Sequence, residues 1–276
     1  MVYETLKICK NLKKITMKSY ISILKGLLGS TALTLGLFAC IGEQSDQLVI
    51  VKPAEGARVK FIHAVADGPG VSILVNNRQF SGVLTTPPAT PATLTYASAF
   101  PISDYATLDA GTAKIEVVIP ASTTAPQTPV ISGNVPIEAN KYYSIFAIGS
   151  VASANLEALV TEDNIVPTDT SKAYIRFVNT VVNATGGYDL GLGTNFPAAL
   201  ANVRYKQISN FVAIDPAPIG AVATAIVVRA NGTTANLAPT TFTLIPIKRR
   251  FYTVFVRGRV GGTGAQAITA TLYTNR

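Results

Sequence analysis

His63 is the only histidine in the 276-residue sequence, so any catalytic arrangement that needs an imidazole must use it. Asp67 follows shortly after, just before a Gly-Pro-Gly turn, and a carboxylate there could orient the imidazole as a general base. However, no G-x-S-x-G sequence is present to supply a serine nucleophile. We therefore favour the alternative, in which His63 and Asp67 fix the loop by hydrogen bonds.

The aspartates are the other candidates for chemistry. Asp104 and Asp109 flank a predicted strand, and Asp215 repeats Asp109 later in the chain. Paired carboxylates serve glycoside hydrolysis or bind calcium. Yet Asn210 stands where the repeat would place a second Asp104, and no D-x-D-x-D-G loop is present. Asp109 precedes Ala-Gly and Asp215 precedes Pro, which indicates turns, with calcium binding and catalysis as alternatives. We predict a protein that is not an enzyme and holds no metal or cofactor.

The N-terminal segment predicts export. Residues 7–25 are basic, and residues 26–39 carry no charge and end on Ala39. This pattern is typical of a cleaved signal peptide over residues 1–39, with Met17 as an alternative start. The uncharged stretch would span about 21 Å, which is short for a transmembrane helix.

The end of this segment, Leu37-Phe38-Ala39-Cys40, resembles the bacterial lipobox. The resemblance implies cleavage between Ala39 and Cys40 and a covalent lipid on Cys40 that binds membrane lipid. No aspartate follows Cys40 directly, so we expect the outer membrane, with the periplasmic and exterior faces both open. Residues 40–56 would form the tether.

The charge and cysteine content exclude several classes of protein. The net charge is +8, but residues 1–39 hold six lysines and one acid, and cleavage leaves 17 basic and 14 acidic residues. This excess does not predict nucleic-acid binding. The run Lys248–Arg250 indicates a solvated turn, with a partner-binding patch as the alternative. The sequence after Cys40 holds no cysteine, which excludes a disulfide scaffold there.

Most of the remaining sequence occurs twice. Residues 57–65 are similar to 173–181, residues 102–110 to 208–216, and residues 141–149 to 250–258. Both copies are short β-rich runs separated by Pro and Gly. We predict an all-β fold of two tandem immunoglobulin-like antiparallel sandwiches, at residues 57–163 and 173–276, joined by a linker at 164–172.

The first copy resembles a known family. Residues 58–75 are similar to the opening of the domain-of-unknown-function family 4397, with matches at His63, Ala64, Asp67 and Pro69. The second copy has Asn179 in place of the histidine, and its resemblance rests on its similarity to the first. The family implies envelope or secreted proteins with immunoglobulin-like sandwiches, often in tandem, and no established activity.

Aromatic residues recur at equivalent places in the two copies. Alternation predicts that Tyr143 and Tyr252 are buried and that Tyr142, Phe146, Phe251 and Phe255 are exposed or half-buried. We expect a non-catalytic, lipid-anchored envelope protein that binds a protein or glycan through its sandwiches. The alternatives are a glycan-binding component of a carbohydrate-uptake assembly, in which an aromatic row would stack on sugars, and a secreted hydrolase.

Overall fold

The computed structural model describes residues 55–81, 92–237 and 242–276. Ala54–Arg276 form one compact unit. The predicted signal peptide, Ala39, Cys40 and the tether up to residue 54 lie outside the described residues. No helix within the described ranges is long and apolar enough to cross a membrane.

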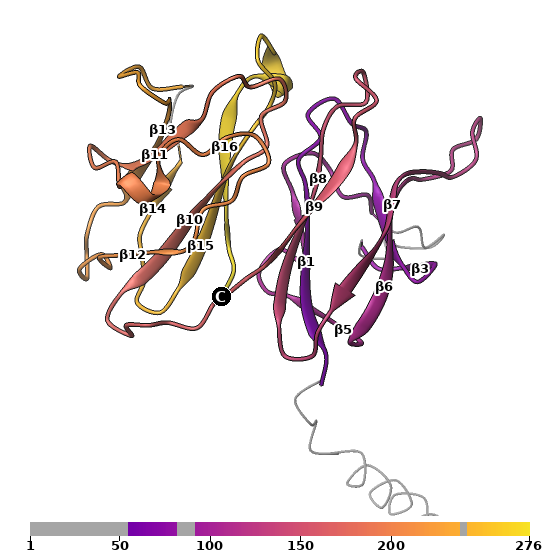
Figure 1. Cartoon of the computed structure of the whole chain (residues 1–276), viewed down its shortest axis with the longest axis horizontal. Helices are drawn as coiled ribbons and strands as arrows, with labels where there is room; N and C mark the ends of the chain where they lie inside the picture. The colour runs from indigo at the N-terminus through magenta and orange to yellow at the C-terminus, as the bar shows by residue number, and fades with distance from the viewer. Residues whose placement is uncertain (1–54, 82–91, 238–241) are drawn as a thin grey trace, which may run out of the picture. The chain divides into compact units, whose positions relative to one another are not determined.

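Residues 57–163, which we call the first half, form two sheets (Figure 1). One sheet has the order β4-β1-β8-β9, with β5 also paired to β1, and the other has the order β3-β2-β6-β7. The strands are β1 (Ala57–His63), β2 (Ser72–Val75), β3 (Arg78–Gln79), β4 (Ala99–Phe100), β5 (Ala106–Leu108), β6 (Gly111–Ile119), β7 (Thr128–Ile137), β8 (Tyr142–Ile148) and β9 (Glu157–Glu162).

Residues 173–276, which we call the second half, repeat this arrangement with sheets of order β12-β10-β15-β16 and β11-β13-β14. Their strands are β10 (Ala173–Asn179), β11 (Tyr188–Leu192), β12 (Val212–Ile214), β13 (Thr224–Ala230), β14 (Thr243–Leu244), β15 (Phe251–Arg257) and β16 (Thr269–Thr274). The only helices in the described residues are the short 3-10 turns η1 (Ala198–Leu200) and η2 (Gly264–Gln266). The predicted all-β fold is confirmed, whereas the predicted division into two tandem domains stays a prediction.

Each half has its own core, built by side-chain alternation. Val59 and Phe61 of β1 and Ile145 of β8 pack against Ile73 of β2 and Ile115 of β6, which belong to the opposite sheet. A separate cluster in the second half joins residues of β10 and β15 to residues of β11 and β13 in the same way. Alternate residues of each strand therefore close the space between two sheets.

One strand pair in each half is parallel, although the sequence pattern favoured antiparallel sheets. Phe61 of β1 lies opposite Ile145 of β8, and Phe177 of β10 lies opposite Val254 of β15. The chain between these strands passes through the other sheet and returns, so both strands of each pair run in the same direction. Segments that are similar in the two copies of the repeat thus have equivalent strand registers in the two halves.

The face of each β1- or β10-containing sheet that points away from its own core is also buried. Ile62, Phe146, Val178, Phe255 and Tyr273 form one apolar cluster drawn from both halves. Phe146 is 0% exposed, and its ring centroid lies 6.0 Å from that of Phe255. The two halves are therefore joined through these sheets.

Candidate functional site

His63 is 1% exposed, and both of its ring nitrogens form hydrogen bonds with backbone groups. Nδ1 accepts a hydrogen bond from the N–H of Val65 at 3.3 Å, and Nε2 lies 2.9 Å from the carbonyl oxygen of Pro69. Because Nδ1 is an acceptor, Nε2 carries the proton and donates to Pro69. Burial lowers the pKa of His63, and the bond to Pro69 opposes this only in part. The imidazole is thus a neutral group that shapes the loop after β1.

Asn179, the counterpart of His63 in the second half, makes the same two kinds of bond. Its Oδ1 accepts the N–H of Val181 at 2.9 Å, and its Nδ2 donates to the carbonyl of Val203 at 2.9 Å. An amide cannot act as a general base at neutral pH. Because both side chains hydrogen-bond to loop backbone in the same way, we interpret His63 as a structural residue.

Asp67 does not hydrogen-bond to His63. Its carboxylate accepts bonds from the Ser150 hydroxyl at 2.6 Å and from the N–H groups of Val151 at 2.9 Å and Ala152 at 3.0 Å. Partial burial acts to raise the pKa of Asp67, but these bonds together lower it. The carboxylate therefore stabilises the turn between β8 and β9.

The other predicted carboxylates lie apart in exposed turns. Asp109 lies between β5 and β6, and Asp104 accepts the N–H of Tyr105 at 2.8 Å. Asp215 follows β12 and pairs with Lys172 at 2.6 Å, with 87% of its side chain exposed. No group of three or more potential metal ligands occurs within the described parts of the chain. The structure therefore brings none of these aspartates into a shared site.

Sequence reasoning missed a buried polar cluster that lies between the two halves. Arg176 and Asp163 form an ion pair, with 2.6 Å between Nη1 of Arg176 and Oδ1 of Asp163. Their side chains are 2% and 0% exposed, respectively. Burial acts to lower the pKa of Arg176, but the Asp163 charge, the nearby tyrosines and the hydrogen bond to Asp163 together outweigh burial and keep that pKa above its ordinary value. Loss of one partner from a buried pair of this kind is strongly destabilising.

Neutral side chains complete this cluster. Asp163 Oδ2 accepts the hydroxyls of Tyr105 at 2.5 Å and Ser144 at 2.6 Å. Arg176 Nε donates to Thr253 at 2.8 Å. Burial and the nearby Asp163 charge raise the pKa of Tyr105, so its hydroxyl remains a donor. The polar interface cluster comprises Lys60, Tyr105, Ser144, Asp163, Arg176, Thr253, Tyr273 and Asn275.

The repeat holds the signal that could have revealed this cluster. Lys60 and Arg176 occupy matching positions in β1 and β10, and each faces the other half. Asp163 and Asn275 also match, since their N–H groups donate to the first residue of β8 at 2.7 Å and of β15 at 2.8 Å, respectively. A cation at the same strand position in both copies is the shared feature. A single strand with one such cation is indistinguishable by sequence from a strand whose polar face meets solvent.

Lys60 is 0% exposed, and its ammonium donates to the carbonyls of Pro101 at 2.7 Å and Ile102 at 3.3 Å. It also lies 5.4 Å from the ring centroid of Tyr105 and 5.6 Å from that of Tyr273. Burial lowers the pKa of Lys60 to about 8, against the opposing effect of the Asp104 and Asp163 charges. The folded protein therefore releases this proton far more readily than the unfolded chain.

This difference predicts a pH-dependent stability. Between about pH 8 and pH 10 the unfolded chain keeps the Lys60 proton and the folded protein loses it, so the free energy of unfolding should rise with pH. Above that window tyrosine ionisation in the unfolded chain opposes the trend, because the folded pKa of Tyr105 is raised. Urea unfolding at several pH values measures the slope. Lys60→Met should abolish the rise, and an unchanged slope in that variant would assign it to another group.

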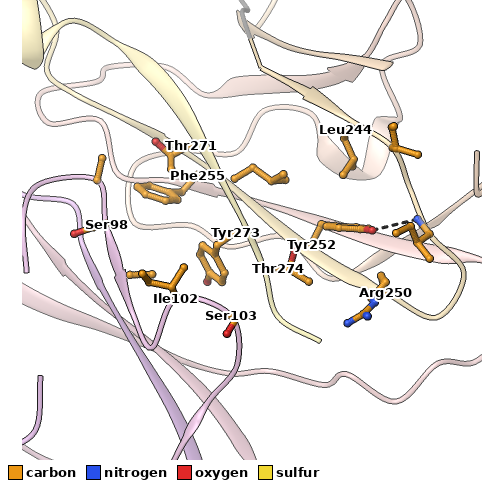
Figure 2. A pocket seen from close by; sticks show the side chains of 15 residues that line it. Ser98, Ile102, Ser103, Leu244, Arg250, Tyr252, Phe255, Thr271, Tyr273 and Thr274 are labelled. Atoms are coloured by element: carbon orange, nitrogen blue, oxygen red, sulfur yellow. Dashed lines mark hydrogen bonds between the residues drawn. The ribbon is translucent and has the colours of Figure 1, made fainter. Parts of the chain in front are cut away.

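A groove of about 790 Å³ opens beside the same interface (Figure 2). Figure 2 shows Ile102 and Ser103 of the first half on one side and Tyr252 and Thr274 of the second half on the other. The hydroxyl of Tyr252 accepts the N–H of Ile247 at 3.1 Å, which fixes one wall. Its volume exceeds that of an adjoining pocket of about 520 Å³.

The predicted exposed aromatic row is wrong for three of its four members. Phe146, Phe251 and Phe255 are at most 1% exposed, and only Tyr142 is half-buried. Phe146 and Phe255 cover each other across the halves, whereas the ring of Phe251 packs against Tyr174 and Phe211 of its own half. The prediction assumed that the outer face of each sheet meets solvent. Within the described parts of the chain, these four rings therefore form no exposed row on which a sugar could stack.

The fold and these contacts define an all-β protein of paired sheets. Its His63, Asp67, Asp163 and Arg176 side chains bond to other groups of the protein and hold its loops and its two halves in place. Within it, residues 57–186 match the family described as "Domain of unknown function (DUF4397)". The match continues through residues 164–172 and β10, and ends before β11, so most of the second half lies beyond it. A comparison with curated proteins finds no match to this chain.

Proposed function

We propose that this is a non-catalytic, lipid-anchored protein of the bacterial cell envelope, whose two β-sheet halves act together as one interaction module. The observation that carries the proposal is that the potentially reactive side chains bond to other groups of the protein. His63 and Asp67 bond to loop backbone, and Arg176 and Asp163 bond to each other across a closed interface. Catalytic groups must instead face a substrate.

A protein partner is better supported than a glycan. Sugar binding through stacking needs exposed aromatic faces, and three of the four rings that would provide them are buried. The groove instead combines apolar side chains with backbone at the edge of a sheet, which suits a polypeptide.

The anchor is tested by Cys40→Ser. Without the thiol no lipid can be added, so we expect the protein to move from the membrane fraction to the soluble fraction. The matched control is Cys9→Ser, which changes the other cysteine within the predicted signal peptide and should leave the protein at the membrane. Cell fractionation followed by immunoblotting measures both. Membrane retention of the Cys40→Ser protein after a carbonate wash would contradict the anchor.

A further inference from the structure

β16 is an outer strand whose free edge lacks the usual protection against pairing. It spans six residues, Thr269–Thr274, with no proline, glycine or charge, and it pairs with β15 without a register shift. Among the described residues no strand pairs with its other edge. Unpaired N–H and C=O groups along such an edge form a template for an added strand.

The other outer strands are protected. β9, the counterpart of β16 in the first half, carries Glu157 and Glu162, which pair with Lys206 at 2.5 Å and Lys141 at 3.1 Å. β7 contains two prolines and its pairing with β6 shifts register. β3, β4, β12 and β14 have two or three residues each, and isolated bridges cover the ends of β11. β5, which also lies beside β1, has three residues, so among the outer strands of the described residues only β16 lacks protection.

The direction of the free backbone groups follows from one hydrogen bond between the residue after β16 and β15. The N–H of Asn275 donates to the carbonyl of Phe251 at 2.8 Å, so it points toward β15. Alternate residues of a strand point their N–H groups in opposite directions. The N–H groups of Thr274 and Leu272 therefore point outward, away from β15.

The groove runs along this edge and continues the interface between the halves. Ala99, Phe255 and Tyr273 belong both to the apolar interface cluster and to the groove lining. Ile102 and Ile247, which also line the groove, are 81% and 56% exposed. A strand added to β16 would lie alongside these isoleucines and extend an existing apolar interface.

One end of the groove is positively charged. Arg250 lines it beside the C-terminal end of β16, because Tyr252 lies opposite Thr274. An adjoining pocket of about 520 Å³ is lined by Lys248, Arg249, Arg250 and Arg276. Within the described ranges none of these four cations belongs to an ion pair. This end is therefore complementary to an acidic group.

We propose that an extended peptide segment of a partner protein adds to β16 as a further strand, with apolar residues in the groove and acidic residues beside Arg250. This inference rests on the proposed function and names the class of partner. A second copy of the chain fits less well. The β16 strand of a second copy would bring Leu272 and Tyr273, which already pack in its own clusters, and it carries no acidic residue to place beside Arg250.

The probe is a fluorescein-labelled peptide with an alternating Val-Thr segment as long as β16 and a pair of aspartates at one end. A second peptide carries the aspartates at the other end, and a third carries lysines. We expect saturable binding of one aspartate peptide, weaker binding of the lysine peptide, and slower amide hydrogen exchange at Leu272 and Thr274.

Matched variants test each part of the site. Thr274→Pro removes an outward N–H and should weaken binding about tenfold, whereas Thr274→Val keeps it and should bind like the wild type. Arg250→Glu should reverse the preference between aspartate and lysine peptides, and Arg78→Glu should not. Ile102→Asp should weaken binding, whereas Ile219→Asp, at an exposed isoleucine outside the groove, should not.

Three results would overturn strand addition. These are no saturable binding of any of the peptides, equal affinity of Thr274→Pro and Thr274→Val in folded protein, and a dimer in sedimentation whose Leu272 and Thr274 amides are protected without peptide. A protein that Cys40→Ser releases from the membrane but that binds no peptide would refute only this inference. Retention of the Cys40→Ser protein would instead count against the proposed anchor.

Discussion

Replacing Arg176 with alanine is expected to lower the free energy of unfolding by about 3–5 kcal/mol, because the Asp163 carboxylate would stay buried without its cation. Asp163 would keep its bonds from Tyr105 and Ser144, but hydroxyl donors do not replace a full opposite charge. Urea unfolding at neutral pH measures the change.

The control for this substitution is an exposed ion pair in the same half. Lys172→Ala breaks the pair between Lys172 and Asp215, and it should lower the free energy of unfolding far less than Arg176→Ala because water screens both charges. A double-mutant cycle between Arg176→Ala and Asp163→Ala should show a coupling of about 2 kcal/mol or more. A loss at Arg176 no larger than at Lys172 would show that the buried pair does not join the halves.

Phe146→Ala should destabilise the protein by about 3–5 kcal/mol through lost burial and an unfilled cavity. Phe146 projects from the first half, yet it contacts Phe255 and Tyr273 of the second half, with ring centroids 6.0 Å and 6.3 Å away. The substitution should therefore also weaken the connection between the halves, so that they begin to unfold separately.

The matched control for Phe146 is Val160→Ala on β9, where the side chain is 36% exposed. This change should cost about 1 kcal/mol or less and leave one unfolding transition. If Phe146→Ala is equally mild, the apolar interface contributes little to holding the halves together.

The sequence predicts the strands well because their alternation is local. Val59, Phe61 and Ile145 lie on the core-facing side that the pattern indicates. The parallel pairing of β1 with β8 could not be predicted, since nothing within either strand specifies which distant segment becomes its neighbour. The repeat was informative here, because matched segments take matched registers in both halves.

The interface escaped prediction for a physical reason. Lys60 and Arg176 alternate with apolar residues, which is also the pattern of a strand with one face in water. Only the fold shows that the two polar faces meet and that Asp163 compensates Arg176. His63 illustrates the reverse case. Its residue type suggested chemistry, whereas its bonds to Val65 and Pro69 show a loop-forming role shared with Asn179.

The central claim is that the buried Arg176–Asp163 pair and the side chains around it join the two halves into one module. Native-state amide hydrogen exchange in increasing urea tests it most directly, with Phe61 of β1 and Ile226 of β13 reporting on the separate cores. We expect both amides to exchange through one cooperative opening of equal free energy, and Arg176→Ala to lower both together. Two openings of different free energy, with Phe61 unaffected by Arg176→Ala, would contradict the claim.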